Sequence, residues 1–395
     1  MNKLTEISKI TGLFLVWRTG LLIISWLANQ LLSYQPSFPY SQDVLANSQL
    51  PQWLYSWANF DGVHYLTIAQ KGYHGTGLIQ AFFPVYPLLI KTVAQLTNLT
   101  HFSALIISGL AISNLSLWLL LILLYYLVKK HFTVKIAWLT LVMLLIFPSS
   151  FFLGAVYNEA LFLTLLIGSF LAAEKKHWWL ASILAGLASA TRVVGVFLIP
   201  ALLITLWQQQ STNTQVSPVV FVQKNWNKIL IIMTGSLGLL GYMFYLQLRF
   251  QDPLYFLHVQ SEFGAGRQEN LILYPQVVWR SIKILLTTRP FNWKYYSYLQ
   301  DFIIGIGGLG LIIWSWLKEN LPLSYIVFAL LAFLTPTLTG TFSSMPRYAL
   351  VCLPIFLYLA KKLSKNKFQL IVYLLISLIF LLINTILFIQ GYWVA

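Results

Sequence analysis

The dominant pattern along the chain is a series of long apolar runs separated by short polar or basic segments. A helix needs roughly 20 mostly apolar residues to cross the hydrocarbon core of a bilayer. Runs of this length lie at 10–32, 103–128, 229–248, 299–317, 321–341 and 368–390. A shorter run covers 347–360, and the stretch 136–173 is interrupted by Phe147-Pro148-Ser149-Ser150, which predicts two helices. We therefore expect an all-α polytopic membrane protein with about 11 transmembrane segments.

The composition supports this prediction and narrows the class. Of the 395 residues, 58% are hydrophobic and only 9% are charged, whereas soluble domains carry roughly 25% charged residues. The net charge of +15 comes from basic residues beside apolar runs, a distribution typical of cytoplasmic loops and of contact with lipid phosphates rather than with nucleic acid. The single Cys352 excludes disulfides. Since no metal-spaced cluster or phosphate loop occurs, we expect no metal site and no cofactor.

Basic clusters predict the orientation of the chain, because cytoplasmic loops are enriched in Lys and Arg. The clusters are Lys3 with Lys9, Lys129-Lys130 with Lys135, Lys175-Lys176, and Lys361-Lys362 with Lys365 and Lys367. If these clusters lie on the cytoplasmic side of the membrane, two large loops, 33–102 and 249–298, lie on the non-cytoplasmic face. We predict a single multi-pass domain over 1–395, located in the plasma membrane if the source is a prokaryote. The first run, which lacks a cleavage site, is interpreted as a membrane helix rather than a signal peptide.

The segment 178–207 lies between two basic clusters, so it must cross the membrane an even number of times. It is short for two full crossings. We therefore predict two short half-helices, a re-entrant pair, that meet near Thr191-Arg192. The break would place Arg192 deep in the membrane, where an arginine costs about 2.5–3.5 kcal/mol on insertion scales.

The most informative segment is 57–87, in the first outer loop. From Asp61 it predicts a short helix that places His64 and Tyr65 on the same face at i+3 and i+4 and ends at Gly72. An apolar stripe continues that face, so the helix could lie flat on the outer membrane surface. Asp61 is either a helix N-cap or a general base. For His64 a structural role is the alternative to catalysis, and for Tyr65 an interfacial one.

The run Asn59-Phe60-Asp61-Gly62-Val63-His64-Tyr65, followed by Phe82-Phe83-Pro84-Val85-Tyr86-Pro87, resembles the first outer loop of PIG-V-like mannosyltransferases. These are relatives of GPI mannosyltransferase II in the GT-C superfamily. Three later pieces fit in order: Tyr157-Asn158-Glu159, Thr191-Arg192-Val193 and Met345-Pro346-Arg347. Phe60 departs from the family, which usually has tryptophan before the aspartate. That difference bears on substrate preference.

The resemblance implies a GT-C-type bundle that transfers mannose, with inversion, from a polyprenyl-phosphate sugar, with Asp61 as the catalytic carboxylate. The acceptor, a glycolipid, glycan or protein, stays open. A departing phosphate needs cations, and arginine suits it by bidentate geometry; Arg192, Arg347 and Arg267 are the candidates. The alternatives are a structural ion pair with Glu159 for Arg192 and snorkelling to the interface for Arg347. Asn158 and Glu159 could bind sugar hydroxyls or, less favourably, a metal.

Two other classes of membrane protein fit parts of the pattern. A transporter or lipid flippase shares the helix count, and an intramembrane arginine such as Arg192 could line its pathway. Transporters often carry broken helices in matching positions of two repeats, whereas one broken segment is evident in this sequence. A GT-C-like polymerase or ligase, which joins whole glycans, would differ in the length of its product.

Overall fold

The computed structural model describes residues 3–38, 41–96, 102–210, 217–263, 266–290, 292–319 and 321–394, and these ranges are helical with no strand. Six helical stretches within them are long and apolar enough to cross a membrane: Lys3–Leu31, Phe102–His131, Val193–Gln210, Pro218–Phe250, Trp293–Glu319 and Lys367–Ile389. Shorter apolar helices accompany them. The all-α membrane architecture is confirmed, whereas the predicted number of about 11 segments is not confirmed by this count.

The N-terminal half begins with a long helix and then folds into short pieces. The long helix is α1 (Lys3–Leu31), and the segment predicted as the first outer loop contains α2 (Gln52–Tyr55), α3 (Asp61–Lys71) and α4 (Val85–Leu96), joined by short 3-10 and π turns. The long α5 (Phe102–His131) follows. The predicted loop 33–102 begins and ends close to these boundaries, although residues 39–40 and 97–101 lie outside the described residues.

Two interruptions in the middle of the chain match the sequence prediction. The first separates α6 (Val134–Leu145) from α7 (Glu159–Glu174), with a 3-10 turn at Ser150–Gly154 between them. The second separates α8 (Trp178–Ser189) from α9 (Leu198–Gln210), with a 3-10 turn at Val193–Phe197 after the break. The predicted break near Thr191-Arg192 is therefore present, but the predicted pair of half-helices is not confirmed, because Val193–Gln210 is long and apolar enough to cross a membrane.

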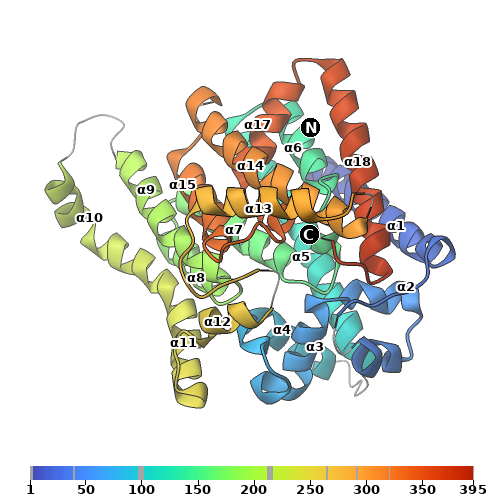
Figure 1. Cartoon of the computed structure of the whole chain (residues 1–395). Coiled ribbons are helices and arrows are strands. Elements are labelled where there is room, and N and C mark those ends of the chain that lie inside the picture. The colour runs from blue at the N-terminus through green and yellow to red at the C-terminus, as the bar shows by residue number, and fades with distance from the viewer. Residues whose placement is uncertain are drawn as a thin grey trace.

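The C-terminal half is built from longer helices with a folded loop between them. Its helices are α10 (Pro218–Met233), α11 (Leu237–Phe250), α12 (Tyr255–His258), α13 (Tyr274–Thr287), α14 (Trp293–Glu319), α15 (Leu323–Thr337), α16 (Met345–Ala349), α17 (Leu353–Leu363) and α18 (Lys367–Ile389). The segment 249–298, predicted as the second outer loop, includes α12, α13 and the start of α14 at Trp293. Figure 1 shows α13 lying across the bundle and α10 at its edge, where α10 packs against α8 and α9.

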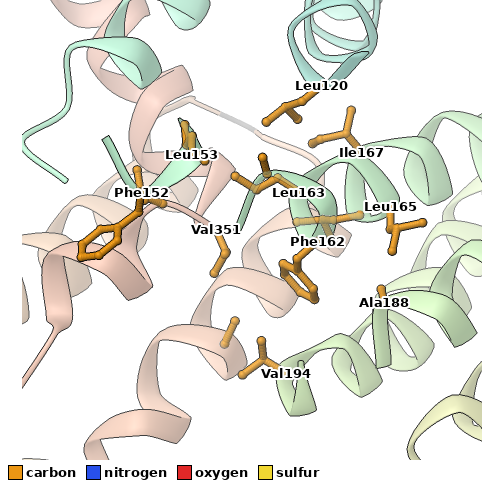
Figure 2. Packing of buried hydrophobic residues seen from close by; sticks show 14 of the residues in the cluster. Leu120, Phe152, Leu153, Phe162, Leu163, Leu165, Ile167, Ala188, Val194 and Val351 are labelled. Carbon is orange, nitrogen blue, oxygen red and sulfur yellow. The ribbon is translucent and has the colours of Figure 1, made fainter. Parts of the chain in front are cut away.

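The core lies where α7 packs between α5 and α8. The side chains of α7 are buried around the whole helix, as expected of a helix that is apolar around its circumference. Figure 2 shows Leu163 and Ile167 of α7 beside Leu120 of α5, with Ala188 and Val194 on the other side of the helix. This packing fixes the start of α7, where the candidate site residues Asn158 and Glu159 lie.

Basic residues gather at one end of the bundle and make contacts that join helices distant in sequence. Lys129 pairs with Glu6 at 2.6 Å and Lys130 with Glu174 at 2.8 Å. Lys361 pairs with Glu319 at 2.5 Å. Glu174 is the last residue of α7 and Glu159 the first, so about 22 Å of helix separate this end from the start of α7. The clusters predicted to share one side of the membrane therefore do share one end of the bundle.

The helix that begins at Asp61 occurs as predicted, but its surroundings differ from the expectation. Tyr65, Ile68 and Ala69, which were expected to lie flat on the membrane surface, are buried. They are buried because α3 packs against α4 and α5. In Figure 1, α3 and α4 form a group at the end of the bundle away from the α17–α18 turn. The apolar stripe therefore faces protein rather than lipid.

Candidate active site

Asp61 is held at the start of α3 by a strained and tightly packed turn. The preceding Phe60 has φ 58° and ψ −117°, a conformation that non-glycine residues seldom adopt and that clusters at functional sites. The backbone N–H of Asp61 donates to the Tyr157 hydroxyl at 3.2 Å, and that hydroxyl donates to the carbonyl of Asn59 at 2.9 Å. A Cβ on Gly62 would lie 3.2 Å from the Ala58 Cβ. Glycine at this position allows the turn to dock closely.

Phe60 packs into an aromatic cage that explains how the strained turn persists. Its ring lies 4.7 Å from Phe38, 5.8 Å from Phe388 and 5.5 Å from Trp393, measured between centroids. The Asn59 side chain donates to the carbonyl of Phe388 at 2.8 Å. The end of α18 and the residues after it therefore fix the backbone next to Asp61, as expected where surrounding structure overrides a local preference.

Glu159 begins α7 and is fully buried, with 0% of its side chain exposed. Its Oε1 accepts from Arg192 at 2.7 Å and from the Nε of Arg347, while Oε2 has no hydrogen-bond partner. Asn158, at the N-cap, donates to the carbonyl of Thr191 at 2.9 Å. The start of α7 is thus tied to the break between α8 and α9. Glu159 organises two arginines and does not line the cavity described below.

Arg192 lies in extended backbone at the break after α8. Besides Glu159, its guanidinium lies 3.4 Å from the Oδ1 of Asn158 and stacks near the rings of Phe162 and Tyr348, at 5.8 and 5.7 Å. The structural ion pair with Glu159, one of the two alternatives for this residue, is present. Because 10% of the Arg192 side chain stays exposed and the residue lines the cavity, the pair leaves room for a second, anionic partner.

Arg347, on the short helix α16, joins the two carboxylates. Its Nη1 pairs with Asp61 and its Nε with Glu159. The guanidinium also lies 4.7 Å from the centre of the Tyr157 ring and 5.3 Å from that of Phe152. Arg347 is therefore held inside the protein, and the alternative in which it snorkels to the membrane interface does not describe this conformation.

His64 and Tyr65 take different positions on α3. The His64 ring stacks on Phe82 at 4.9 Å and meets Phe263 edge-on at 6.1 Å, and its buried Nδ1 has no hydrogen-bond partner. Tyr65 is only 2% exposed and packs edge-on against Phe82, Tyr86 and Tyr157. His64 thus retains an unused polar atom, whereas Tyr65 forms part of the wall behind Asp61.

Arg267 lies between α12 and α13. Its Nη1 donates to the Gln260 side chain at 3.1 Å, and its guanidinium lies 5.9 Å from the Phe263 ring centre. No carboxylate among the described residues forms an ion pair with it. It is therefore a cation that an added anion could neutralise.

Most of these side chains line one cavity of about 1130 Å³. Seven of the eight residues predicted from the sequence line it: Asp61, His64, Tyr65, Asn158, Arg192, Arg267 and Arg347. Glu159 lies behind them. Of the two carboxylates bound to Arg347, only Asp61 has an exposed side-chain surface, 24% against 0% for Glu159. Asp61 is therefore the one that can meet a substrate.

The charges around Asp61 decide its ionisation. Burial raises the pKa of Asp61, but the attraction and hydrogen bond of Arg347 outweigh burial, so the pKa lies below the ordinary carboxyl value. Burial lowers the pKa of the His64 imidazole, and nearby Asp61 opposes this only in part. At neutral pH the cavity therefore presents an ionised Asp61 beside a neutral His64.

Two residues of the site had no predicted role. Tyr157 contacts both Asp61 and Arg347; its place directly before Asn158-Glu159 was the available signal. Asp301 of α14 lines the cavity although it is only 4% exposed; a lone acid at the end of an apolar run was its signal. No three His, Cys, Asp or Glu side chains in the described ranges gather closely enough to hold a metal ion. Metal independence stays a prediction.

Comparison with known proteins adds a likeness of architecture. No protein-family profile matches the sequence, and no curated protein sequence matches it. Among solved structures, the Archaeoglobus fulgidus oligosaccharyltransferase in complex with zinc and sulfate is 13% identical, with a TM-score of 0.44, over 95% of this chain and 53% of that one. The archaeal oligosaccharyltransferase AglB from the same organism, in complex with an inhibitory peptide and a dolichol-phosphate, is 13% identical at a TM-score of 0.44, over 97% and 56%. This chain spans about half the length of those proteins. At these values the likeness carries no argument about function.

Proposed function

We propose that the protein is an inverting membrane glycosyltransferase that transfers mannose from a polyprenyl-phosphate donor to an acceptor hydroxyl. The observation that carries the proposal is one arrangement of charges. Asp61 faces a large cavity while bound to Arg347, and Arg192 and Arg267 line the same cavity. A carboxylate beside several arginines suits a reaction in which a hydroxyl loses a proton and a phosphate departs.

In the proposed step the acceptor oxygen attacks the anomeric carbon of the donor. Asp61 takes the proton of the acceptor hydroxyl, the bond between the anomeric carbon and the phosphate oxygen breaks, and its electron pair stays with the phosphate. A phosphate is a good leaving group, so a single carboxylate suffices. Retention of configuration would require a second, nucleophilic carboxylate. Glu159 does not suit that role, because it is buried behind the two arginines.

The arginines supply the cations that a departing phosphate needs. The charges of Asp61, Glu159, Arg192 and Arg347 balance one another, so an incoming phosphate finds its free cation in Arg267. Arg347 could also exchange part of its contact with Asp61 for the phosphate. Such an exchange would raise the pKa of Asp61 and make it a stronger base once the donor is bound.

Mannose and the polyprenyl-phosphate donor are supported by the resemblance of the motifs to PIG-V-like mannosyltransferases. The non-cytoplasmic location of the site is supported by its distance from the basic end of the bundle, since basic loops favour the cytoplasm. The acceptor, whether glycolipid, glycan or protein, is left to experiment.

The proposal is tested by incubating the purified protein with polyprenyl-phosphate-mannose and membrane lipids and measuring the mannosylated product. The native protein should transfer the sugar, and Asp61→Asn should lower turnover by about 10²–10⁴-fold. Glu319→Gln is the matched control, since it also removes a paired carboxylate but at the opposite end of the bundle, and it should retain activity. Undiminished turnover by Asp61→Asn would contradict the assignment. Movement of the lipid across proteoliposomes without any transfer would favour a transporter instead.

A further inference from the structure

Asp301 is a buried carboxylate in the cavity that the proposed reaction does not use. It lies near the start of α14, is 4% exposed, and lines the same cavity as Asp61 and Arg347. A buried carboxylate is costly unless it is hydrogen-bonded or paired with a cation. We propose that Asp301 is a positioning residue, which holds the short helix α16 so that Arg347 is presented to the phosphate. This inference rests on the proposed function.

The first support is a direct hydrogen bond to the start of α16. The backbone N–H of Met345 donates to the Oδ1 of Asp301 at 3.1 Å. Met345 is the first residue of α16, and Arg347 follows two residues later. The first N–H groups of a helix have no partner within the helix, so Asp301 supplies from α14 the acceptor that a capping side chain would otherwise provide.

The second support is the unfavourable backbone of the turn that Asp301 secures. Ser344, directly before α16, adopts a left-handed conformation with φ 69°. Its own side chain forms no capping hydrogen bond to the helix. A non-glycine residue keeps such a conformation when surrounding contacts fix it. The bond from Asp301 to the next residue is such a contact.

The third support is that α14 and the turn after α6 contact this turn and α16 at two further points. Phe342 packs on Gly305, one helical turn beyond Asp301, where a Cβ would lie 2.9 Å from the phenyl ring. From the turn between α6 and α7, the Ser149 hydroxyl donates to the carbonyl of Pro346 at 2.7 Å. Helix α16 is thus held by contacts from two separate segments, and its Arg347 side chain reaches both Asp61 and Glu159.

The hydrogen bond, rather than the charge, is the feature that this role requires. An asparagine has nearly the same shape, and its side-chain oxygen can still accept from Met345. An alanine cannot. Asp301→Asn should therefore keep most of the function, whereas Asp301→Ala should release α16 and displace Arg347. A misplacement on the order of 1 Å can cost about a hundredfold in rate.

The test measures donor use and phosphate binding in five proteins: native, Asp301→Ala, Asp301→Asn, Arg347→Ala and the double variant with alanine at both positions. Binding is measured with undecaprenyl phosphate on the detergent-purified protein, so it does not depend on turnover. Asp301→Ala should weaken binding and lower kcat/KM for the donor by about ten- to a hundredfold. If Asp301 acts through Arg347, the double variant should bind no more weakly than Arg347→Ala alone, because coupled residues are not additive. Asp301→Asn should restore binding close to the native value.

Gln300→Ala serves as the control for a general loss of stability. Gln300 is the neighbour of Asp301 on α14 but bonds to Asn384 of α18 and not to α16. It should lower the unfolding temperature while leaving undecaprenyl phosphate binding unchanged. Equal losses from Asp301→Ala in the native and Arg347→Ala backgrounds would overturn the inference, as would native binding by Asp301→Ala. Binding without any sugar transfer would refute the proposed function alone, and absence of binding by the native protein would refute both.

Discussion

Removing the buried carboxylate of Glu159 should destabilise the protein more than removing that of Asp61. Glu159 is 0% exposed and accepts from both Arg192 and Arg347. Its loss leaves Arg192, whose side chain is 10% exposed, without a carboxylate partner among the described residues, and leaves Arg347 with Asp61 alone. Breaking a buried ion pair by deleting one partner costs about 3–5 kcal/mol. We expect a loss of about that size in the free energy of unfolding for Glu159→Ala.

Asp61→Asn should lower sugar transfer strongly and the free energy of unfolding only weakly. Asp61 is 24% exposed, and the only cation that it pairs with among the described residues is Arg347, which keeps Glu159 when Asp61 is replaced. A hydrogen bond to a charged group contributes about 1.5–3 kcal/mol, and the asparagine retains part of it. Stability should therefore fall less than in Glu159→Ala, while sugar transfer should fall by about 10²–10⁴-fold.

The assay is denaturant unfolding of the detergent-purified variants, followed by circular dichroism, beside transfer rates measured on the same preparations. Glu319→Ala is the control, because its partner Lys361 is 24% exposed and can be solvated once the carboxylate is removed, so its loss of stability should be smaller than that of Glu159→Ala. If Glu159→Ala unfolds within about 0.5 kcal/mol of the native protein, the assignment of Glu159 as the organiser of the two arginines is wrong.

Three further outcomes follow from individual contacts. The pKa of Asp61 lies below the ordinary carboxyl value, so its ionised form persists as the pH falls, and the acid limb of kcat/KM should lie below about pH 4; a limb near pH 6 would contradict this. The ion pair between Asp61 and Arg347 stabilises the fold at pH values above the pKa of Asp61 in the unfolded protein. This stabilisation is lost as the pH falls through the lower pKa of Asp61 in the folded protein. Arg192→Lys should weaken donor use, measured as KM, because lysine lacks the guanidinium fork; an unchanged KM would favour a purely structural pair with Glu159. Asn384→Ala should cost about 1–3 kcal/mol in unfolding free energy, because it leaves Gln300 and other buried groups without partners; unchanged unfolding would show that this network contributes little.

The sequence by itself determined most of the helices and the two interruptions between α6 and α7 and between α8 and α9. Hydropathy is a property of neighbouring residues, and proline interrupts a helix where it stands, so the first break could be predicted from local pattern. The second break was predicted because a segment short for two crossings lies between basic clusters that require an even number of them. The helix that begins at Asp61 was predicted from local pattern as well. Counting crossings between basic clusters predicted that Asp61, Glu159, Arg192 and Arg347 share one side of the membrane, and that this side is the non-cytoplasmic one stays a prediction.

What only the tertiary structure decided is which of these charges meet. Arg347 binds Asp61 across 286 residues of chain and Glu159 across 188, and no local pattern specifies such a pairing. The burial of α3 was likewise hidden, because an apolar stripe looks the same whether it faces lipid or protein. The acceptor role of Asp301 depends on a turn 44 residues away. The charged residues of the candidate site could therefore be identified from the sequence. Packing between distant helices determined which of them are buried and which line the cavity.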